Sequence, residues 1–364
     1  MKYAVVHDRL CNRGGAEKVA IAIAEALEAD IYTAKFENEK TYEVGQKVTE
    51  TNPISFFGSN KIFMLVRMLD SISFAQLENL NDYDVVWMSG MWAHFAAYNN
   101  SKNIYYCHSP NRLIYNIAQA SREKIGPFLK PLFLTWRSFW RSADKKAVSS
   151  VNKILCNSMN VSKRIKRFWN RQAKVVYPPV KLSNFYNGDV EDYWLSVNRI
   201  TPEKRVNLQL DVFEKLPEER LIMVGAAEFE SPYQKEIGKR IEEMRNVKWM
   251  SNLSDEKLRE LYAHCKGTIQ TAQDEDFGYI PPESFAAGKP CLAVNEGGFK
   301  ESIENKKTGL LIKRPYLENF VKSIRDFDPD RFESSKIQNH SEKFSEERFR
   351  EEIKKITRKV EKIA

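Results

Sequence analysis

Residues 267–295 read GTIQTAQDEDFGYIPPESFAAGKPCLAVN, two short apolar segments joined by an acidic loop and a proline-led segment. The segments GTIQTA (267–272) and PCLAVN (290–295) have the composition of buried β-strands. Pro281 and Pro282 fit the first turn of a helix, because proline lacks only an N–H group that would be unpaired there. The stretch therefore predicts a strand, a helix and a second strand, as in a parallel sheet covered by helices.

The same alternation runs through the rest of the chain. Segments of helical periodicity separate further strands, which we expect at residues 2–8, 30–35, 84–90, 103–109, 153–158, 174–180, 193–199, 220–225 and 247–252. Helices are expected in the second half at 207–216, 233–245 and 255–265. A polar, turn-rich segment at 181–192 separates the two halves. The pattern predicts an α/β chain with two doubly wound domains, residues 1–180 and 181–340.

The C-terminal segment, residues 341–364, is predicted to form a helix of its own. Ser345 is a good N-cap, and acidic residues follow it in the first turn. A single apolar stripe runs along this helix, formed by Phe349, Ile353, Ile356, Val360 and Ile363. Such a stripe must be buried against another surface. We expect the helix to pack on the N-terminal domain.

Composition limits the class of protein. With 364 residues and 42% hydrophobic content, the chain is long enough for two cores. The five cysteines are scattered without a CxxC pair, which argues against a disulfide framework or zinc site and favours a reducing compartment. No segment resembles a signal peptide or a spanning helix. We expect a cytoplasmic protein, with attachment to the cytoplasmic face of a membrane as an alternative.

The net charge of +8 is compatible with nucleic acid, anionic lipid or phosphorylated small molecules as partners. Charge alone does not choose among them. Nucleic acid is disfavoured, because the basic stretches lie on amphipathic helices without a known nucleic-acid-binding module.

The acidic triplet Asp274-Glu275-Asp276 has two interpretations. It could hold a divalent metal beneath a nucleotide phosphate. Alternatively, Glu275 in the loop and Glu283 in the helix that follows could accept hydrogen bonds from the vicinal hydroxyls of a nucleotide sugar. The residues alone leave both open.

Other candidate residues follow the predicted strands, where ligands bind in open α/β sheets. Gly14-Gly15 precedes a helix and suits close approach of an anion, although a tight turn explains it equally well. His108 lies at the carboxyl end of the strand at 103–109. Arg199 ends the strand at 193–199 and Lys204 follows it, and two cations at one strand end suit a diphosphate. A solvated charged loop is the competing interpretation.

Together these segments resemble glycosyltransferase family 4, the retaining enzymes of GT-B fold. RGGAEKV (13–19) is similar to the family's N-terminal glycine loop, and VNRITPEKRVNL (197–208) to its diphosphate loop. EDFGYIPPESFAAGKPCLA (275–293) matches the C-terminal signature of two glutamates separated by seven residues. Three more segments carry the resemblance, namely NEGGFKESI, TGLLI and YCHSPNR. The last of these is most like O-antigen and lipid-linked mannosyltransferases.

The resemblance implies a GT-B fold, two Rossmann-like domains facing a cleft, with an acceptor-binding N-terminal domain, a nucleotide-sugar-binding C-terminal domain and a C-terminal helix that crosses back. It also implies roles for individual residues. Arg199 and Lys204 would neutralise the donor diphosphate. Glu275 would hold the transferred sugar with the amides of Phe277 and Gly278.

Four further residues gain roles from the same resemblance. Glu283 would bind the ribose hydroxyls, and His108 would lie beside the anomeric carbon and its leaving oxygen. Gly14 and Gly15 would let the N-terminal domain close on the donor phosphates or the acceptor. The family usually has glycine where this chain has Asp276, and this departure affects the contacts to the donor sugar.

The expected activity is retaining transfer of a hexose, with mannose as first choice, to a glycan or polyprenyl-linked acceptor. The donor would be GDP-mannose or a UDP-sugar, and neither a cofactor nor a metal is expected. Alternatives are a nucleotide-sugar epimerase or hydrolase of the same fold, and a non-catalytic nucleotide-sugar binder. The binder is disfavoured, because Arg199, Lys204, Glu275 and Glu283 are all present.

Residues 127–149 predict a basic and aromatic helix. Its apolar positions, Leu129, Leu132, Phe133, Trp136 and Trp140, fall on one face, and Lys130, Arg137, Arg141 and Lys145 gather on another. This spacing suits a helix that lies on an anionic membrane. A long core helix with a solvated basic side is the alternative.

Overall fold

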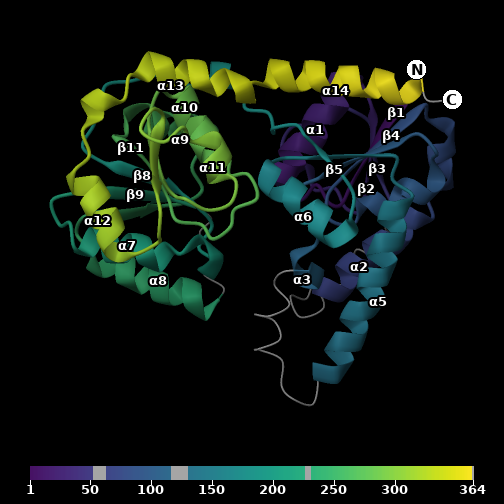
Figure 1. The fold of residues 1–364 in the computed structure, drawn as a ribbon, viewed down its shortest axis with the longest axis horizontal. Helices are drawn as coiled ribbons and strands as arrows, with labels where there is room; N and C mark the ends of the chain where they lie inside the picture. Colours follow the sequence, from purple (N-terminus) through teal and green to yellow (C-terminus); the bar gives the residue numbers. More distant parts are fainter. Residues whose placement is uncertain (52–62, 116–129, 226–230, 363–364) are drawn as a thin grey trace. The chain divides into compact units, whose positions relative to one another are not determined.

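The computed structural model describes residues 1–51, 63–115, 130–225 and 231–362. The chain divides into two compact units. Unit 1 comprises Met1–Pro179 and Glu347–Ala364, and unit 2 comprises Val180–Glu346. Each unit is built around its own parallel sheet (Figure 1).

Unit 1 contains a seven-stranded sheet in the order β3-β2-β1-β4-β5-β6-β7. Every pairing in it is parallel. The order reverses direction next to β1, so the loops after β1 and β4 lie at a topological switch point, where open sheets bind ligands. The strands are β1 (Tyr3–His7), β2 (Asp30–Thr33), β3 (Val48–Glu50), β4 (Val85–Ser89), β5 (Asn103–Cys107), β6 (Lys153–Cys156) and β7 (Lys174–Val175).

Helices cover both faces of this sheet. On one face, α1 (Gly15–Leu27) and α14 (Glu346–Glu361) share a buried cluster with Val5, Trp87 and Tyr106. The opposite face packs against α2 (Phe63–Ala75), α5 (Lys130–Ser149) and α6 (Met159–Trp169), together with the short η3 (Ala93–Asn99) and α3 (Arg112–Tyr115). Successive side chains of a strand point to opposite faces of the sheet. Neighbouring residues of one strand therefore belong to the buried clusters on opposite faces.

The C-terminal helix α14 belongs to the core of unit 1. Phe349, Ile353, Ile356 and Val360 are buried in the cluster that contains α1. The indole of Trp87 donates to the hydroxyl of Thr357 at 3.2 Å, and Arg350 pairs with Glu25 of α1 at 2.6 Å. The apolar stripe seen in the sequence is therefore the buried face of this helix. Ile363, its last predicted member, lies outside the described residues.

Unit 2 contains a six-stranded parallel sheet in the order β10-β9-β8-β11-β12-β13. The strands are β8 (Trp194–Val197), β9 (Leu221–Val224), β10 (Val247–Met250), β11 (Gly267–Gln270), β12 (Cys291–Val294) and β13 (Gly309–Ile312). The helices between and after them are α7 (Val206–Glu214), α8 (Pro232–Glu243), α9 (Asp255–His264), α10 (Ile280–Ala286), α11 (Phe299–Ser302), α12 (Leu317–Arg325) and α13 (Ser334–Ser341). The opening stretch of sequence thus forms β11, α10 and β12, as predicted.

The structure differs from the sequence prediction at the sheet edges. The strand expected at 174–180 joins the sheet only at Lys174–Val175, and Val180 forms an isolated bridge with Ser345. Pro178 and Pro179, between them, cannot donate to a ladder. The edge strand β3 was not predicted from the sequence. It has only three residues, and none of them is fully buried. All five cysteines are free thiols.

Candidate active site

The loop between β8 and α7 carries the two predicted diphosphate ligands, Arg199 and Lys204. Arg199 is exposed, and its guanidinium forms no ion pair within the part of the chain that the structure describes. Lys204 ends a short 3-10 turn, η5 (Pro202–Lys204). Its Nζ lies 2.6 Å from Oε2 of Glu275. Two predicted site residues, 71 positions apart in the chain, are therefore in direct contact.

Glu275 lies in the loop between β11 and α10. Its side chain is 23% exposed, so the carboxylate can exchange one partner for another without full desolvation. The next residues hold the loop in place. Phe277 is buried, and Gly278 has a φ of +82°, where an added Cβ would lie 2.5 Å from the ring of Phe299. Only glycine fits there, for both conformational and steric reasons.

Glu283 lies in the first turn of α10, which begins with Ile280, Pro281 and Pro282. Its Oε2 accepts a hydrogen bond of 2.9 Å from the hydroxyl of Tyr262. Tyr262 is buried, and its pKa is raised well above the usual value by burial and by the nearby Glu283 charge. The tyrosine therefore stays protonated and remains a hydrogen-bond donor to this carboxylate.

A buried polar network holds the Lys204 loop against the end of β11. The hydroxyl of Thr271 donates to the carbonyl oxygen of Lys204 at 2.6 Å and accepts from Nε2 of Gln209 at 2.9 Å. Oε1 of Gln209 accepts from Ser196 at 2.6 Å, and Ser196 accepts from Asn198. Each member is at most 8% exposed. A fully paired network of this kind fixes one arrangement of the loop.

Two charged residues at this site were not among the sequence candidates. Arg205 follows Lys204 directly, and its Nη1 lies 3.1 Å from the carboxylate of Glu296, in the loop after β12. The segment containing Glu296 carried part of the family resemblance, but nothing in the sequence paired it with Arg205.

The predicted residues of unit 1 lie after β1 and β5. Gly14 is the N-cap of α1 and Gly15 its first residue. Gly14 has a φ of −106°, so its backbone conformation does not require glycine. An added Cβ would meet only the Glu17 side chain, which can move. Gly14 therefore does not form a strained turn, and the Glu17 side chain lies against it at the start of α1.

His108 follows β5 and is only partly exposed. Its Nε2 lies 2.9 Å from the hydroxyl of Ser89 at the end of β4. Nδ1 of His7, at the end of β1, lies 2.6 Å from the carbonyl oxygen of the same serine. Burial, and secondarily the charge of His7, lowers the pKa of His108 to about 3. The ring is therefore neutral at pH 7 and can act as a hydrogen-bonding group without carrying a charge.

Helix α5 only partly matches the predicted division into an apolar and a basic face. Trp136 and Trp140 pack against the core of unit 1. Two of the predicted basic residues also face the protein, since Arg137 donates to the carbonyl of Ile114 at 2.6 Å and Arg141 lies over the ring of Tyr115. Leu132, Leu134 and Phe139 remain exposed, at 69%, 39% and 65%. Residues 127–129, the predicted start of this helix, lie outside the described residues.

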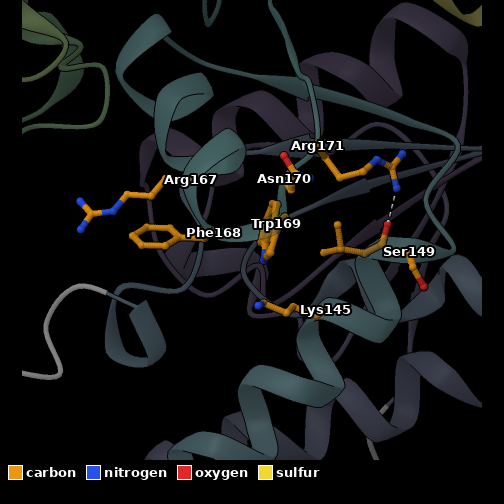
Figure 2. Close-up of a pocket in the computed structure, with 8 residues that line it drawn as sticks. Lys145, Ser149, Arg167, Phe168, Trp169, Asn170 and Arg171 are labelled. Atoms are coloured by element: carbon orange, nitrogen blue, oxygen red, sulfur yellow. Dashed lines mark hydrogen bonds between the residues drawn. The ribbon is translucent and has the colours of Figure 1, made fainter.

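A pocket of about 330 Å³ opens where α5 and α6 end in unit 1. Figure 2 shows Arg171 turned toward the end of α5, where it donates to the carbonyl of Val148 at 2.9 Å. It also donates to the carbonyl of Val151, just after the helix, at 2.7 Å. This arginine therefore stabilises the helix C-terminus. The pocket is lined by Lys145, Val148, Ser149, Arg167, Phe168, Trp169, Asn170 and Arg171.

The described residues bear on the metal site and the membrane contact that the sequence left open. Among them, no group of three histidine, cysteine or acidic side chains is arranged to hold a metal ion. None of the described helices is long and apolar enough to cross a bilayer.

Comparison with known proteins identifies the family. Residues 13–184 match the model of glycosyltransferase family 4, and residues 187–347 match that of the group 1 glycosyl transferases. The chain belongs to glycosyltransferase family 4. The two matches together include every predicted site residue, and the enzyme is a glycosyltransferase.

Relatives and solved structures support this assignment. The α-1,3/1,6-mannosyltransferase ALG2 of Dictyostelium discoideum is 22% identical, over 99% of this chain and 98% of the relative. A solved structure of Anabaena Alr3699/HepE in complex with UDP and glucose aligns with a TM-score of 0.75 at 18% identity, covering 99% of this chain and 100% of that one. Sucrose-phosphate synthase from Thermosynechococcus elongatus aligns with a TM-score of 0.78 at 16% identity, covering 99% of each chain. The glycosyltransferase therefore has the GT-B fold expected from its sequence.

Proposed function

We propose that this glycosyltransferase transfers a hexose, with mannose as first choice, from a nucleotide-diphosphate sugar to a glycan or lipid-linked acceptor with retention of configuration. The contact between Lys204 and Glu275 carries the proposal, because it brings together a cation that suits a diphosphate and a carboxylate that suits sugar hydroxyls. The similarity to the mannosyltransferase ALG2 supports mannose, and the solved HepE complex with UDP and glucose supports a nucleotide sugar as donor.

In this proposal, unit 2 binds the donor. Arg199 and Lys204 neutralise the charge that develops on the leaving diphosphate, which lowers the energy of the transition state. Glu275 accepts hydrogen bonds from the transferred sugar, assisted by the backbone amides of Phe277 and Gly278. Glu283, held by Tyr262, accepts from the ribose hydroxyls.

The residues of unit 1 contribute in a different way. His108 acts as a neutral hydrogen-bonding group beside the anomeric carbon, since its pKa is about 3. It does not supply a positive charge at neutral pH. Gly14 and Gly15 let the start of α1 approach the donor phosphates or the acceptor. Charge neutralisation is assigned to the arginine and lysine, so the proposed reaction needs no metal.

A thermal-stability screen tests the donor assignment. We expect GDP-mannose or a UDP-sugar to raise the melting temperature, because a ligand that binds only the folded state stabilises it by mass action. The screen contains GDP-mannose, UDP-glucose, UDP-galactose, GDP and UDP, and each hit is then assayed for transfer and for hydrolysis. A protein that is stabilised by none of them would contradict the proposal, and hydrolysis without transfer to any acceptor would favour a hydrolase.

We also propose that α5 contacts an anionic membrane. The supporting observation is that Leu132 and Phe139 are 69% and 65% exposed and lie two helical turns apart on one face. Exposed Lys145 and Lys146 lie on the same helix. Exposed apolar side chains beside lysines suit insertion at the surface of a membrane with anionic lipids.

Flotation with vesicles of phosphatidylcholine and phosphatidylglycerol tests this contact. We expect the wild-type protein to float at low salt, and Leu132→Ser/Phe139→Ser to remain at the bottom of the gradient. Tyr316→Ser, which removes an exposed aromatic side chain of unit 2, serves as the matched control and should float like wild type. Flotation of the double variant equal to wild type would show that α5 is not the contact.

A further inference from the structure

Arg205 adopts a backbone conformation that arginine rarely takes. Its φ and ψ are 50° and 45°, in the left-handed region, between η5 and α7. This conformation is unfavourable for a residue with a Cβ, whereas glycine adopts it freely. The cost is offset only if the arginine side chain does something that glycine cannot do.

The guanidinium of Arg205 bridges the loops that follow three neighbouring strands. Its own loop follows β8. Nη1 lies 3.1 Å from both carboxylate oxygens of Glu296, which follows β12. The same Nη1 lies 3.5 Å from the carbonyl oxygen of Thr271, which follows β11. The side chains are 22% and 28% exposed, so the pair is partly shielded from water.

Glu296 in turn begins the segment that supports the backbone of Glu275. The amide of Gly298 donates to the carbonyl oxygen of Glu275 at 2.9 Å. Gly297 has a φ of +54°, and an added Cβ there would lie 2.3 Å from the Glu275 carbonyl oxygen. The two backbones are packed without a gap. A shift of Glu296 is therefore transmitted to Glu275.

We propose that Arg205 and Glu296 are a positioning pair, which holds the Glu275 loop where its carboxylate meets Lys204 and the donor sugar. Neither side chain is assigned a contact with the reacting atoms; both act through Glu275. This inference rests on the proposed function and extends it to two residues outside the predicted site.

Arg205→Gly and Glu296→Gln test the pair. Glycine suits the left-handed conformation, so Arg205→Gly removes the bridge without straining the backbone. Lys306→Gly is the matched control, because Lys306 also has a positive φ, of 67°, in unit 2. Donor turnover is followed as GDP release from GDP-mannose or UDP release from UDP-glucose, whichever the stability screen selects. The binding of GDP and UDP alone is measured by calorimetry.

We expect each of the two variants to lower kcat/KM about tenfold, with the double variant no worse than either single variant, since both remove the same interaction. The affinity for GDP or UDP alone should not weaken, because the pair acts on the sugar-binding carboxylate. Lys306→Gly should behave as wild type. Amide hydrogen exchange should be faster at residues 273–278 in both test variants, and this readout does not depend on turnover.

Three results would contradict the proposal that Arg205 and Glu296 position the Glu275 loop. These are kcat/KM values within twofold of the control, losses that add in the double variant, and unchanged hydrogen exchange at 273–278. A wild-type protein that turns over no nucleotide sugar would instead contradict the proposed function, and the exchange measurement would still decide whether the pair holds the loop.

Discussion

Replacing Glu275 with glutamine should strengthen the binding of a nucleoside diphosphate that carries no sugar. In the structure, the Glu275 carboxylate forms an ion pair with Lys204, with Oε2 2.6 Å from Nζ. A diphosphate that binds Lys204 must displace this carboxylate and is also repelled by its charge. Glutamine removes the competing charge while keeping the shape of the side chain. The free lysine then becomes available to the ligand.

The size of the effect follows from the exposure of the pair. The side chains of Lys204 and Glu275 are 17% and 23% exposed. Exposed ion pairs contribute about 0.2–1 kcal/mol, and hydrogen bonds to charged groups about 1.5–3 kcal/mol. We take about 1.4 kcal/mol, which is a tenfold decrease in the dissociation constant. Transfer should fall by at least tenfold in the same variant, because the sugar hydroxyls lose a charged acceptor.

Calorimetric titration with GDP and UDP at low salt measures this prediction. Glu260→Gln is the matched control, since Glu260 pairs with Lys257 at 2.8 Å on the surface of α9, and it should bind both nucleotides as wild type does. Opposite changes in nucleotide affinity and in transfer would show that Glu275 exchanges Lys204 for the sugar. Weaker or unchanged nucleotide binding by Glu275→Gln would refute the reasoning.

Three further predictions test other parts of the site. Thr271→Val should cost about 1–3 kcal/mol of unfolding free energy in urea, because Gln209 and the carbonyl of Lys204 lose a buried partner, and Thr271→Ser should restore it. The folded pKa of His108 is about 3 against 6.5 unfolded, so the unfolded state binds the proton first and stability falls as the pH drops below 6.5. Between pH 7 and pH 5 this loss is about 2 kcal/mol, and His108→Gln should show a flatter profile. Chelation of divalent cations with EDTA should leave transfer unchanged, and a loss that Mg²⁺ restores would argue for a metal on the 274–276 carboxylates.

The sequence predicted most of the fold because the strands are short, apolar and separated by periodic helices. The 267–295 stretch became β11, α10 and β12 with boundaries within a few residues of those expected. The edges were less predictable. Strand β3 carries little apolar character, and its pairing depends on the neighbour it finds in the folded chain, which no local pattern encodes.

The sequence predicted which residues are candidates for the site, because residue type and position after a strand are enough for that. It did not predict which of these residues contact each other in the folded chain. Lys204 and Glu275 were both candidates, but no local pattern indicates that these two residues, 71 positions apart, contact each other. Arg205 was not a candidate, because a positive φ cannot be inferred for an arginine from its neighbours. The division of α5 into buried tryptophans and exposed Leu132 and Phe139 depends on tertiary packing in the same way.

The rate of sugar transfer by Lys204→Ala tests the central claim most directly. Loss of one charged contact to the leaving diphosphate should cost about 2–4 kcal/mol of transition-state stabilisation, which is a decrease of about 30- to 1000-fold. Circular dichroism should show an intact fold, and Lys257→Ala, which removes an exposed lysine of the same unit, should transfer at the wild-type rate. A Lys204→Ala enzyme that transfers as fast as wild type would contradict the assignment of this loop to the donor diphosphate.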